Sequence, residues 1–281
     1  MANNPPRRAR SLFRFLPAVL LLGACATDEL QRPLGQAGFF GANLCPAVDG
    51  LRAMTVSPGS PAEKGRLRDG DVLVGYAGTD LAGEAARKGL LEDVRAGAGK
   101  TFRLTVKRDG KTVAVKVVPG KKDVFPRDEL YAALADEILS GRNVSVAVVI
   151  TQVNTAKPEF FDNQEALAAW KAGMENSLKN NFETLLLNKA FLRCGNFSVA
   201  DRDKTDRVLK ELGFQMTGAV SAETAKQVGR MTGASHLLFI DFTRFQQASG
   251  AYEDDSSVRL VAVESDNVLA SVRFRQRVDP R

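Results

Sequence analysis

The side chains best suited to nucleophilic or metal chemistry are few in this chain. Its 281 residues include three cysteines and one histidine. Cys194 with His236 could form a nucleophile and base pair. His236 begins an apolar β-run, however, where a packed ring is the simpler interpretation. The remaining thiols and one imidazole fall short of a typical zinc site. We therefore expect no enzyme activity, no metal and no cofactor.

Cys25 ends a short apolar run, residues 15–22, that follows a basic start. The basic residues are Arg7, Arg8, Arg10 and Arg14. This layout is typical of a signal peptide, and the run is far shorter than the roughly 20 residues of a membrane-spanning helix. We expect residues 1–24 to be removed. Ordinary cleavage after Ala24 or Ala26 is the alternative to lipid modification.

The segment Leu22-Gly23-Ala24-Cys25 resembles a bacterial lipobox. The resemblance implies that Cys25 is lipidated and becomes the first residue of the mature chain, with residues 25–33 as a tether. Two or three acyl chains hold a protein at a bilayer effectively permanently. Ala26, rather than an aspartate, follows the cysteine. This suggests an outer-membrane lipoprotein of the cell envelope that faces the periplasm.

The basic charge of the chain lies largely in its leader. The formal net charge is +6, and residues 1–24 carry four arginines and no acidic residue. Loss of the leader therefore removes four of these six charges. No basic stripe of the kind that binds phosphates remains, so nucleic acid is not an expected partner.

Cys45 and Cys194 are the two other cysteines. In an oxidising compartment they could form one disulfide between distant parts of the chain. They could equally be two separately buried small apolar residues. The sequence leaves both alternatives open.

A composition break at residues 120–123 predicts two domains, because about 250 residues are large for one core. We expect the first domain over residues 34–120, a linker over 121–126 and the second domain over 127–281.

Short strands and turns dominate the first domain. Residues 51–56 predict a strand, and Ser60 is placed to cap a helical turn with Pro61 at its first position. Residues 84–95 predict a helix. Asp109-Gly110 lies between two alternating β-runs and predicts a tight hairpin.

Two stretches of the first domain resemble the PDZ family, SPGSPAEKGRLRDGDVLVGYAG and GAGKTFRLTVKRDGK. The resemblance implies a partly open β-barrel with a helix, and binding of an extended or C-terminal peptide as an added strand. It places the ligand at a loop, an edge strand and a facing helix. The implied site residues are Gly38, Phe39, Phe40, Gly41, Ala42, Leu44, Leu90 and Leu91. Phe39 and Phe40 could instead belong to the core.

The second domain alternates helices and strands. Residues 127–139 predict a helix, and NVSVAVVITQV predicts a buried strand because it is nearly continuous in β-branched residues. Apolar residues from Leu167 to Leu185 recur every three or four positions and predict one long helix. Two further helices and three closing strands complete an α/β layer with a largely antiparallel end. We expect Asp254-Asp255 in a solvated hairpin loop.

The stretches FSVADRDKTDRVLKELGFQMTGAV and MTGASHLLFIDFTRF resemble the curli-secretion (CsgG) lipoprotein family. The resemblance implies an α/β domain with a mixed sheet, and ring formation by relatives makes a homo-oligomer possible. The membrane-crossing hairpins of the secretion channel are missing between residues 153 and 164. We therefore expect a lipid-anchored adaptor that binds a peptide through its first domain and docks an envelope protein through its second. The alternative is an accessory activator of cell-wall synthesis, or of an envelope secretion or proteolysis complex.

Overall fold

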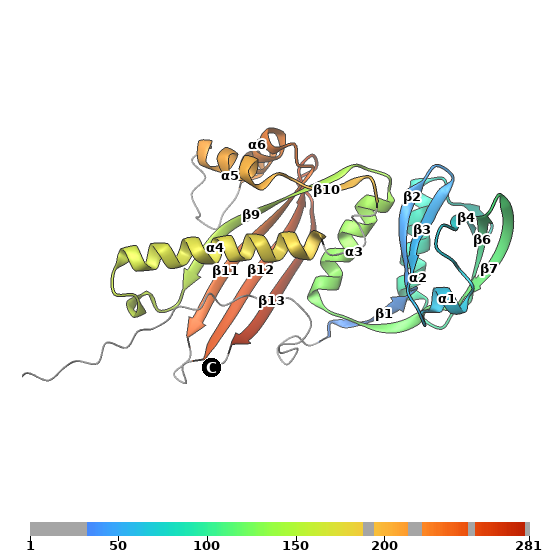
Figure 1. Cartoon of the computed structure of the whole chain (residues 1–281), viewed down its shortest axis with the longest axis horizontal. Helices are drawn as coiled ribbons and strands as arrows, with labels where there is room; N and C mark the ends of the chain where they lie inside the picture. Colours follow the sequence, from blue (N-terminus) through green and yellow to red (C-terminus); the bar gives the residue numbers. More distant parts are fainter. Residues whose placement is uncertain (1–32, 188–193, 213–220, 247–250, 279–281) are drawn as a thin grey trace, which may run out of the picture.

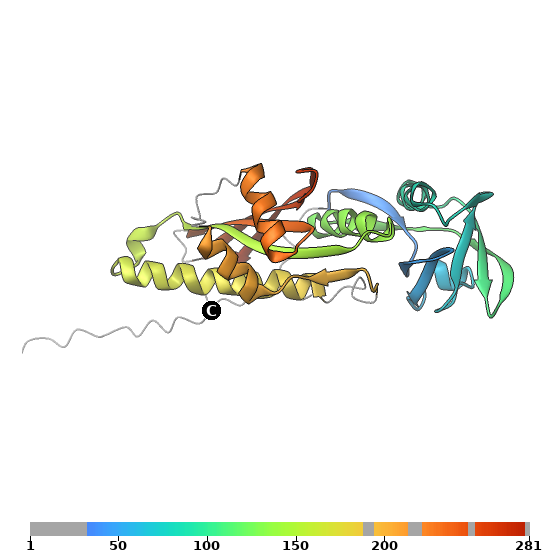
Figure 2. The same cartoon turned by 90° about the horizontal axis from the view of Figure 1, so that it is seen from above.

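The computed structural model describes residues 33–187, 194–212, 221–246 and 251–278. The predicted leader, Cys25 and its tether up to residue 32 lie outside the described residues. Figure 1 shows two halves side by side, each with its own sheet, and Figure 2 shows that they lie along one long axis. Within the described ranges, none of the helices combines the length and apolar character needed to cross a membrane.

The first half is built on an open antiparallel sheet in the order β2-β3-β4-β6-β7, with β5 paired to β4. These strands are β2 (Ala42–Ala47), β3 (Gly50–Val56), β4 (Val72–Tyr76), β5 (Thr79–Asp80), β6 (Phe102–Arg108) and β7 (Lys111–Val117). The sheet does not close on itself, so β2 and β7 are its two edges. This confirms the partly open β fold expected from the sequence.

Local sequence signals determine the turns of this half. Asp109 and Gly110 both have positive φ, 49° and 74°, as a two-residue type I′ hairpin requires. Helix α1 (Pro61–Lys64) begins after Ser60, whose Oγ accepts a hydrogen bond from the Glu63 amide at 3.3 Å. Helix α2 (Glu84–Ala96) packs onto the sheet through Leu90.

The two ends of the first half meet. Strand β1 (Gly35–Phe39) pairs with β8 (Gly120–Val124) in an antiparallel two-stranded sheet. Most of the stretch expected to be a linker is therefore the strand β8. Helix α3 (Pro126–Leu139) begins two residues after β8 ends.

The second half is built on a mixed sheet in the order β10-β9-β11-β12-β13. Its strands are β9 (Val144–Thr155), β10 (Phe197–Val199), β11 (His236–Gln246), β12 (Tyr252–Ala262) and β13 (Val268–Val278). Strands β10, β9 and β11 are parallel, and β11, β12 and β13 are antiparallel. The remaining elements are η2 (Pro158–Phe160), α4 (Gln164–Leu187), α5 (Arg202–Glu211) and α6 (Ala222–Thr232). The expected mixed sheet is confirmed.

Strand β9 is buried on both faces, which explains its nearly continuous apolar sequence. Val146 and Val148 point into a core with α3 and α4, whereas Ala147 and Val149 point into a smaller core with α5 and α6. Figure 1 shows α4 crossing the sheet, with α5 and α6 near one end of it. The strand alternation thus produces three layers.

The expected place of Asp254 and Asp255 is wrong. Both lie within β12 and are only 2% and 8% exposed. Arg244 donates two hydrogen bonds of 2.7 Å to Asp254, and Arg273 donates to Asp255. Two adjacent carboxylates are tolerated in a buried strand because each faces an arginine from a neighbouring strand.

The two halves are joined covalently. Cys45 in β2 forms a disulfide with Cys194, 149 residues away, just before β10. Of the two alternatives left open by the sequence, the structure therefore has the disulfide. Cys45 belongs to the core of the second half, while Leu139 of α3 belongs to the core of the first. Each half thus contributes a buried side chain to the other.

Candidate functional site

An apolar cavity of about 150 Å³ lies between β2 and α2. Its lining residues are Phe40, Ala42, Asn43 and Leu44 on the β2 side, Leu90, Leu91 and Val94 on α2, and Ala135 and Leu139 on α3. Five of the eight predicted site residues line it: Phe40, Ala42, Leu44, Leu90 and Leu91. The strand, the helix and the end of the loop between β1 and β2 therefore meet at one cavity, while Gly38, Phe39 and Gly41 are not among its lining residues. The third wall, α3, comes from the second half.

Strand β2 offers the backbone of a sheet edge to this cavity. It pairs with β3 and with no other described strand. An edge strand has backbone N–H and C=O groups available to an added strand. Pro46 has no N–H group, so donors from β2 are limited to the residues before and after it.

Close packing against Ser60 restricts which residue the loop between β1 and β2 can have at position 41. Gly41 has φ of 82°, and a Cβ there would lie 2.2 Å from the Ser60 Cβ. The carbonyl groups of Phe40 and Gly41 accept hydrogen bonds from the amides of Ala62 and Ser57, at 2.9 and 2.8 Å. A β-branched residue at Gly41 would therefore strain the fold itself, so it cannot serve as a clean test of binding.

Phe39, at the end of β1, and Phe40, in the loop after it, have different environments. Phe40 is 8% exposed, belongs to the core of the first half and lines the cavity. Phe39 is 37% exposed and is not among the lining residues. Gly38 also lies outside the lining, and a Cβ there would meet the Val94 carbonyl oxygen at 1.7 Å. Gly38 thus permits the contact between β1 and α2.

The sequence did not predict four lining residues: Asn43, Val94, Ala135 and Leu139. Asn43 and Val94 follow from the positions of β2 and α2. Ala135 and Leu139 were missed because α3 was expected to face only its own domain. A signal did exist in the sequence, since the apolar residues of the segment 126–139 spread around more than one face of a helix.

Charged pairs lie at both ends of α2, the helix that lines the cavity. The Arg95 guanidinium at the end of α2 donates two hydrogen bonds, of 3.0 and 2.7 Å, to the Asp136 carboxylate of α3. At the start of α2, Glu84 pairs with Lys88 at 3.0 Å and with Arg142 at 3.5 Å. The hydrogen bond from Lys88 lowers the pKa of the Glu84 carboxyl, so Glu84 is ionised and can hold both cations.

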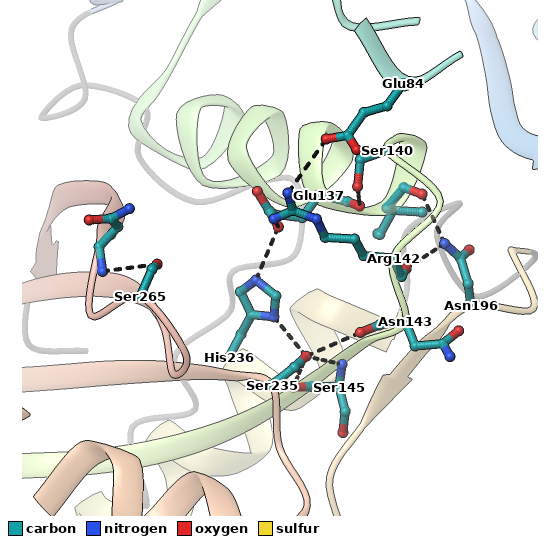
Figure 3. Close-up of polar contacts among 12 residues, drawn as sticks. Glu84, Glu137, Ser140, Arg142, Asn143, Ser145, Asn196, Ser235, His236 and Ser265 are labelled. Atoms are coloured by element: carbon teal, nitrogen blue, oxygen red, sulfur yellow. Dashed lines mark hydrogen bonds and ion pairs between the residues drawn. The ribbon is translucent and has the colours of Figure 1, made fainter. Parts of the chain in front are cut away.

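His236 lies in a separate polar cluster between α3 and β11, shown in Figure 3. Its Nδ1 is 2.8 Å from the Ser235 Oγ, and its Nε2 is 3.7 Å from the Glu137 carboxylate, longer than a hydrogen bond. Burial lowers the pKa of His236, against the opposing effect of Glu137. The possible Cys194 and His236 pair does not form, because the Cys194 sulfur is bonded to Cys45.

Comparison with known proteins gives partial similarities. No family model matches the chain. Over 74 residues, 26% of its length, the chain is 35% identical to the putative serine protease HhoA of Synechocystis sp.. It spans 18% of the length of that curated relative.

Solved structures are similar to separate parts of the chain. The HtrA3 PDZ domain bound to a phage-derived ligand is 21% identical, with a TM-score of 0.28, and covers 32% of this chain and 90% of its own. The LpoB C-terminal domain from Salmonella enterica is 15% identical, with a TM-score of 0.29; the match covers 50% of this chain and 84% of that domain's chain. The serine endoprotease from Yersinia pestis is 20% identical, with a TM-score of 0.27; the match covers 31% of this chain and 30% of the endoprotease chain.

Proposed function

We propose that this chain is a non-catalytic, lipid-anchored adaptor of the cell envelope. In this proposal the first half binds an extended or C-terminal peptide, and the second half docks an envelope protein. The observation that carries the peptide proposal is the apolar groove between the free edge of β2 and α2. Such a groove suits a peptide that adds as a strand and places alternate apolar side chains against the helix.

The chemistry of the groove indicates the class of ligand. Leu90, Leu91 and Val94 present an aliphatic wall, so an aliphatic or aromatic side chain fits better than a charged one. The loop of Phe40 and Gly41 precedes β2 beside the groove, and its backbone amides are the proposed partners of a terminal carboxylate. The disulfide between Cys45 and Cys194 supports an oxidising compartment such as the periplasm. The anchor itself rests on the sequence at Cys25.

The test is a titration of the full chain, in mild detergent, with a fluorescent peptide that ends in an apolar residue. We expect an affinity no tighter than about the micromolar range, because a small interface must also offset the ordering of the peptide. An amide cap on the peptide end should weaken binding at least tenfold, since it removes a charge-assisted contact of about 1.5–3 kcal/mol.

Two variants localise the site. Leu91→Lys places a charge in the groove and should abolish binding, because Leu91 is only half-buried and lines the cavity. Val113→Lys is the matched control: Val113 is also half-buried at the same core but lies on β7, at the opposite edge of the sheet. Binding that ignores both the amide cap and Leu91→Lys would place the peptide elsewhere.

A further inference from the structure

Helix α3 has two apolar faces that serve different halves. Leu130, Leu134 and Ile138 are fully buried in the core of the second half. Leu139, 5% exposed, belongs to the core of the first half, and Ala135 packs against that core. These last two residues line the groove together with residues of β2 and α2. The second half therefore supplies the cover of the groove.

The cover leaves too little room for a peptide. The remaining cavity is about 150 Å³, whereas pockets for small ligands start at about 300 Å³. An added strand would lie about 4.8 Å from β2. Helix α3 packs against β2, and its Leu139 and Ala135 line the cavity together with Ala42 and Leu44 of β2. A peptide strand added at this edge would therefore compete with α3 for the same space.

Ion pairs fasten α2 to the second half at both of its ends. Near the last turn, Arg95 binds the Asp136 carboxylate and donates a further hydrogen bond of 3.3 Å to the Ala132 carbonyl. At the first turn, Glu84 meets Arg142, which also binds Glu137 of α3 at 3.1 Å (Figure 3). The two helices thus run in opposite directions along the groove.

The disulfide between Cys45 and Cys194 holds the two walls of the groove near each other. Cys45 is the neighbour of Leu44, which lines the groove, and Cys194 precedes β10 of the second half. The disulfide keeps β2 close to α3 and so raises the effective concentration of the cover. A competing peptide must displace a neighbour that cannot diffuse away.

We propose that α3 closes the peptide groove and that the Cys45–Cys194 disulfide controls this closure, so that reduction opens the groove. The inference rests on the proposed peptide-binding function and adds its regulation. The reductant is a dithiol: it supplies two electrons and two protons and becomes a disulfide, while the bond between the Cys45 and Cys194 sulfurs becomes two thiols. Both cysteines are at most 5% exposed, so the exchange is slow while the groove is closed.

The experiment compares peptide affinity in closed and opened forms of the full chain, in detergent, by fluorescence anisotropy. The forms are the oxidised protein, the protein reduced with dithiothreitol, and the Cys45→Ala/Cys194→Ala variant. We expect the two opened forms to bind at least tenfold more tightly. The apparent affinity rises with the fraction of molecules in the binding-competent state.

A second variant keeps the disulfide and weakens the cover by charge alone. Asp136→Arg faces Arg95 with a like charge, and Asp136 does not line the groove. We expect at least threefold tighter binding than in the oxidised protein. The matched control, Lys107→Glu, breaks the exposed pair of Lys107 with Asp49 within the first half and should leave affinity unchanged.

Hydrogen exchange of β2 separates the two proposals. If α3 covers the groove reversibly, the amides of residues 42–47 exchange faster in both opened forms and in Asp136→Arg. Equal exchange and equal peptide affinity in all forms would overturn the regulation and leave peptide binding intact. Faster exchange without peptide binding in any form would overturn the peptide-binding function, and with it the role of the disulfide.

Discussion

His236 is a buried residue whose surroundings affect its charge state. Its side chain is 5% exposed, and its Nε2 has no hydrogen-bond partner. Burial disfavours the imidazolium and lowers the pKa below that of the unfolded chain, about 6.5. The ring is therefore neutral in the folded protein at neutral pH. Glu137 and Arg142 are the charged groups that face it.

The lowered pKa of His236 predicts a loss of stability in acid. Between the folded pKa and about pH 6.5 the unfolded chain binds more protons, so the free energy of unfolding falls as the pH decreases through this window. The slope from one histidine is at most about 1.4 kcal/mol per pH unit. Urea unfolding of the protein at a series of pH values from 8 to 5 measures it.

The control is His236→Phe, which keeps a ring at the same buried position. The difference in unfolding free energy between the two proteins should shift in favour of the variant as the pH falls, and should be constant above pH 7. A constant difference over the whole range would contradict the lowered pKa of His236.

At the scale of elements, local signals were enough to place most helices and strands. The helix expected at residues 84–95 is α2, and the one expected at 127–139 is α3. The Asp109-Gly110 turn and the Ser60 cap also follow from residue type alone, because a positive φ or an unsatisfied helix amide needs only its nearest neighbours.

What the sequence did not predict depends on contacts between distant residues. Asp254 and Asp255 look like a loop because their partners, Arg244 and Arg273, come from other strands. The second face of α3 has the same origin, since Leu139 is buried by residues some 50 to 100 positions earlier. Five of the residues named through the family resemblance line one cavity, and their role in binding stays a prediction, whereas the contribution of α3 to that cavity was not predicted.

The contact between β1 and α2 predicts effects of different size for substitutions at two glycines of β1. A Cβ on Gly38 would lie 1.7 Å from the Val94 carbonyl oxygen, whereas a Cβ on Gly35 would meet no atom within 4 Å. Gly38→Ala should lower the free energy of unfolding by about 2 kcal/mol through overpacking. Gly35→Ala should change it by less than about 1 kcal/mol.

Chemical denaturation of both glycine variants measures this difference. Equal stability of the two would show that β1 and α2 can separate at no cost, contrary to the packing described.

For the whole molecule, the question is whether the halves can exist apart. The main core of the second half consists of its own residues apart from Cys45 of β2 and Met54, which packs against it from β3. The disulfide closes a loop of 149 residues and stabilises the joined protein by about 5 kcal/mol in the chain-entropy model. The halves thus depend on each other for a small part of their packing, for one covalent bond and for the ion pairs between α2 and the second half.

A fragment from Asp123 to Arg281 should therefore fold alone, with lower stability than the full chain. Leu139 and Ala135 would become exposed, and the place of Cys45 in the core would be empty. A thermal melt followed by circular dichroism should be cooperative. A gradual melt would mean that the two halves share one core.

The pairing of β1 with β8 determines how the protein responds to a mechanical load. The Leu34 amide donates to the Val124 carbonyl at 2.7 Å, so the chain enters and leaves the first half at the same point. A force between residue 34 and α3 pulls the two strands apart from one end. The pairs then open one after another, from Gly35 and Val124 towards Phe39 and Gly120, as in a zipper. A load applied at residue 34 would therefore break these few hydrogen bonds before it reached either core.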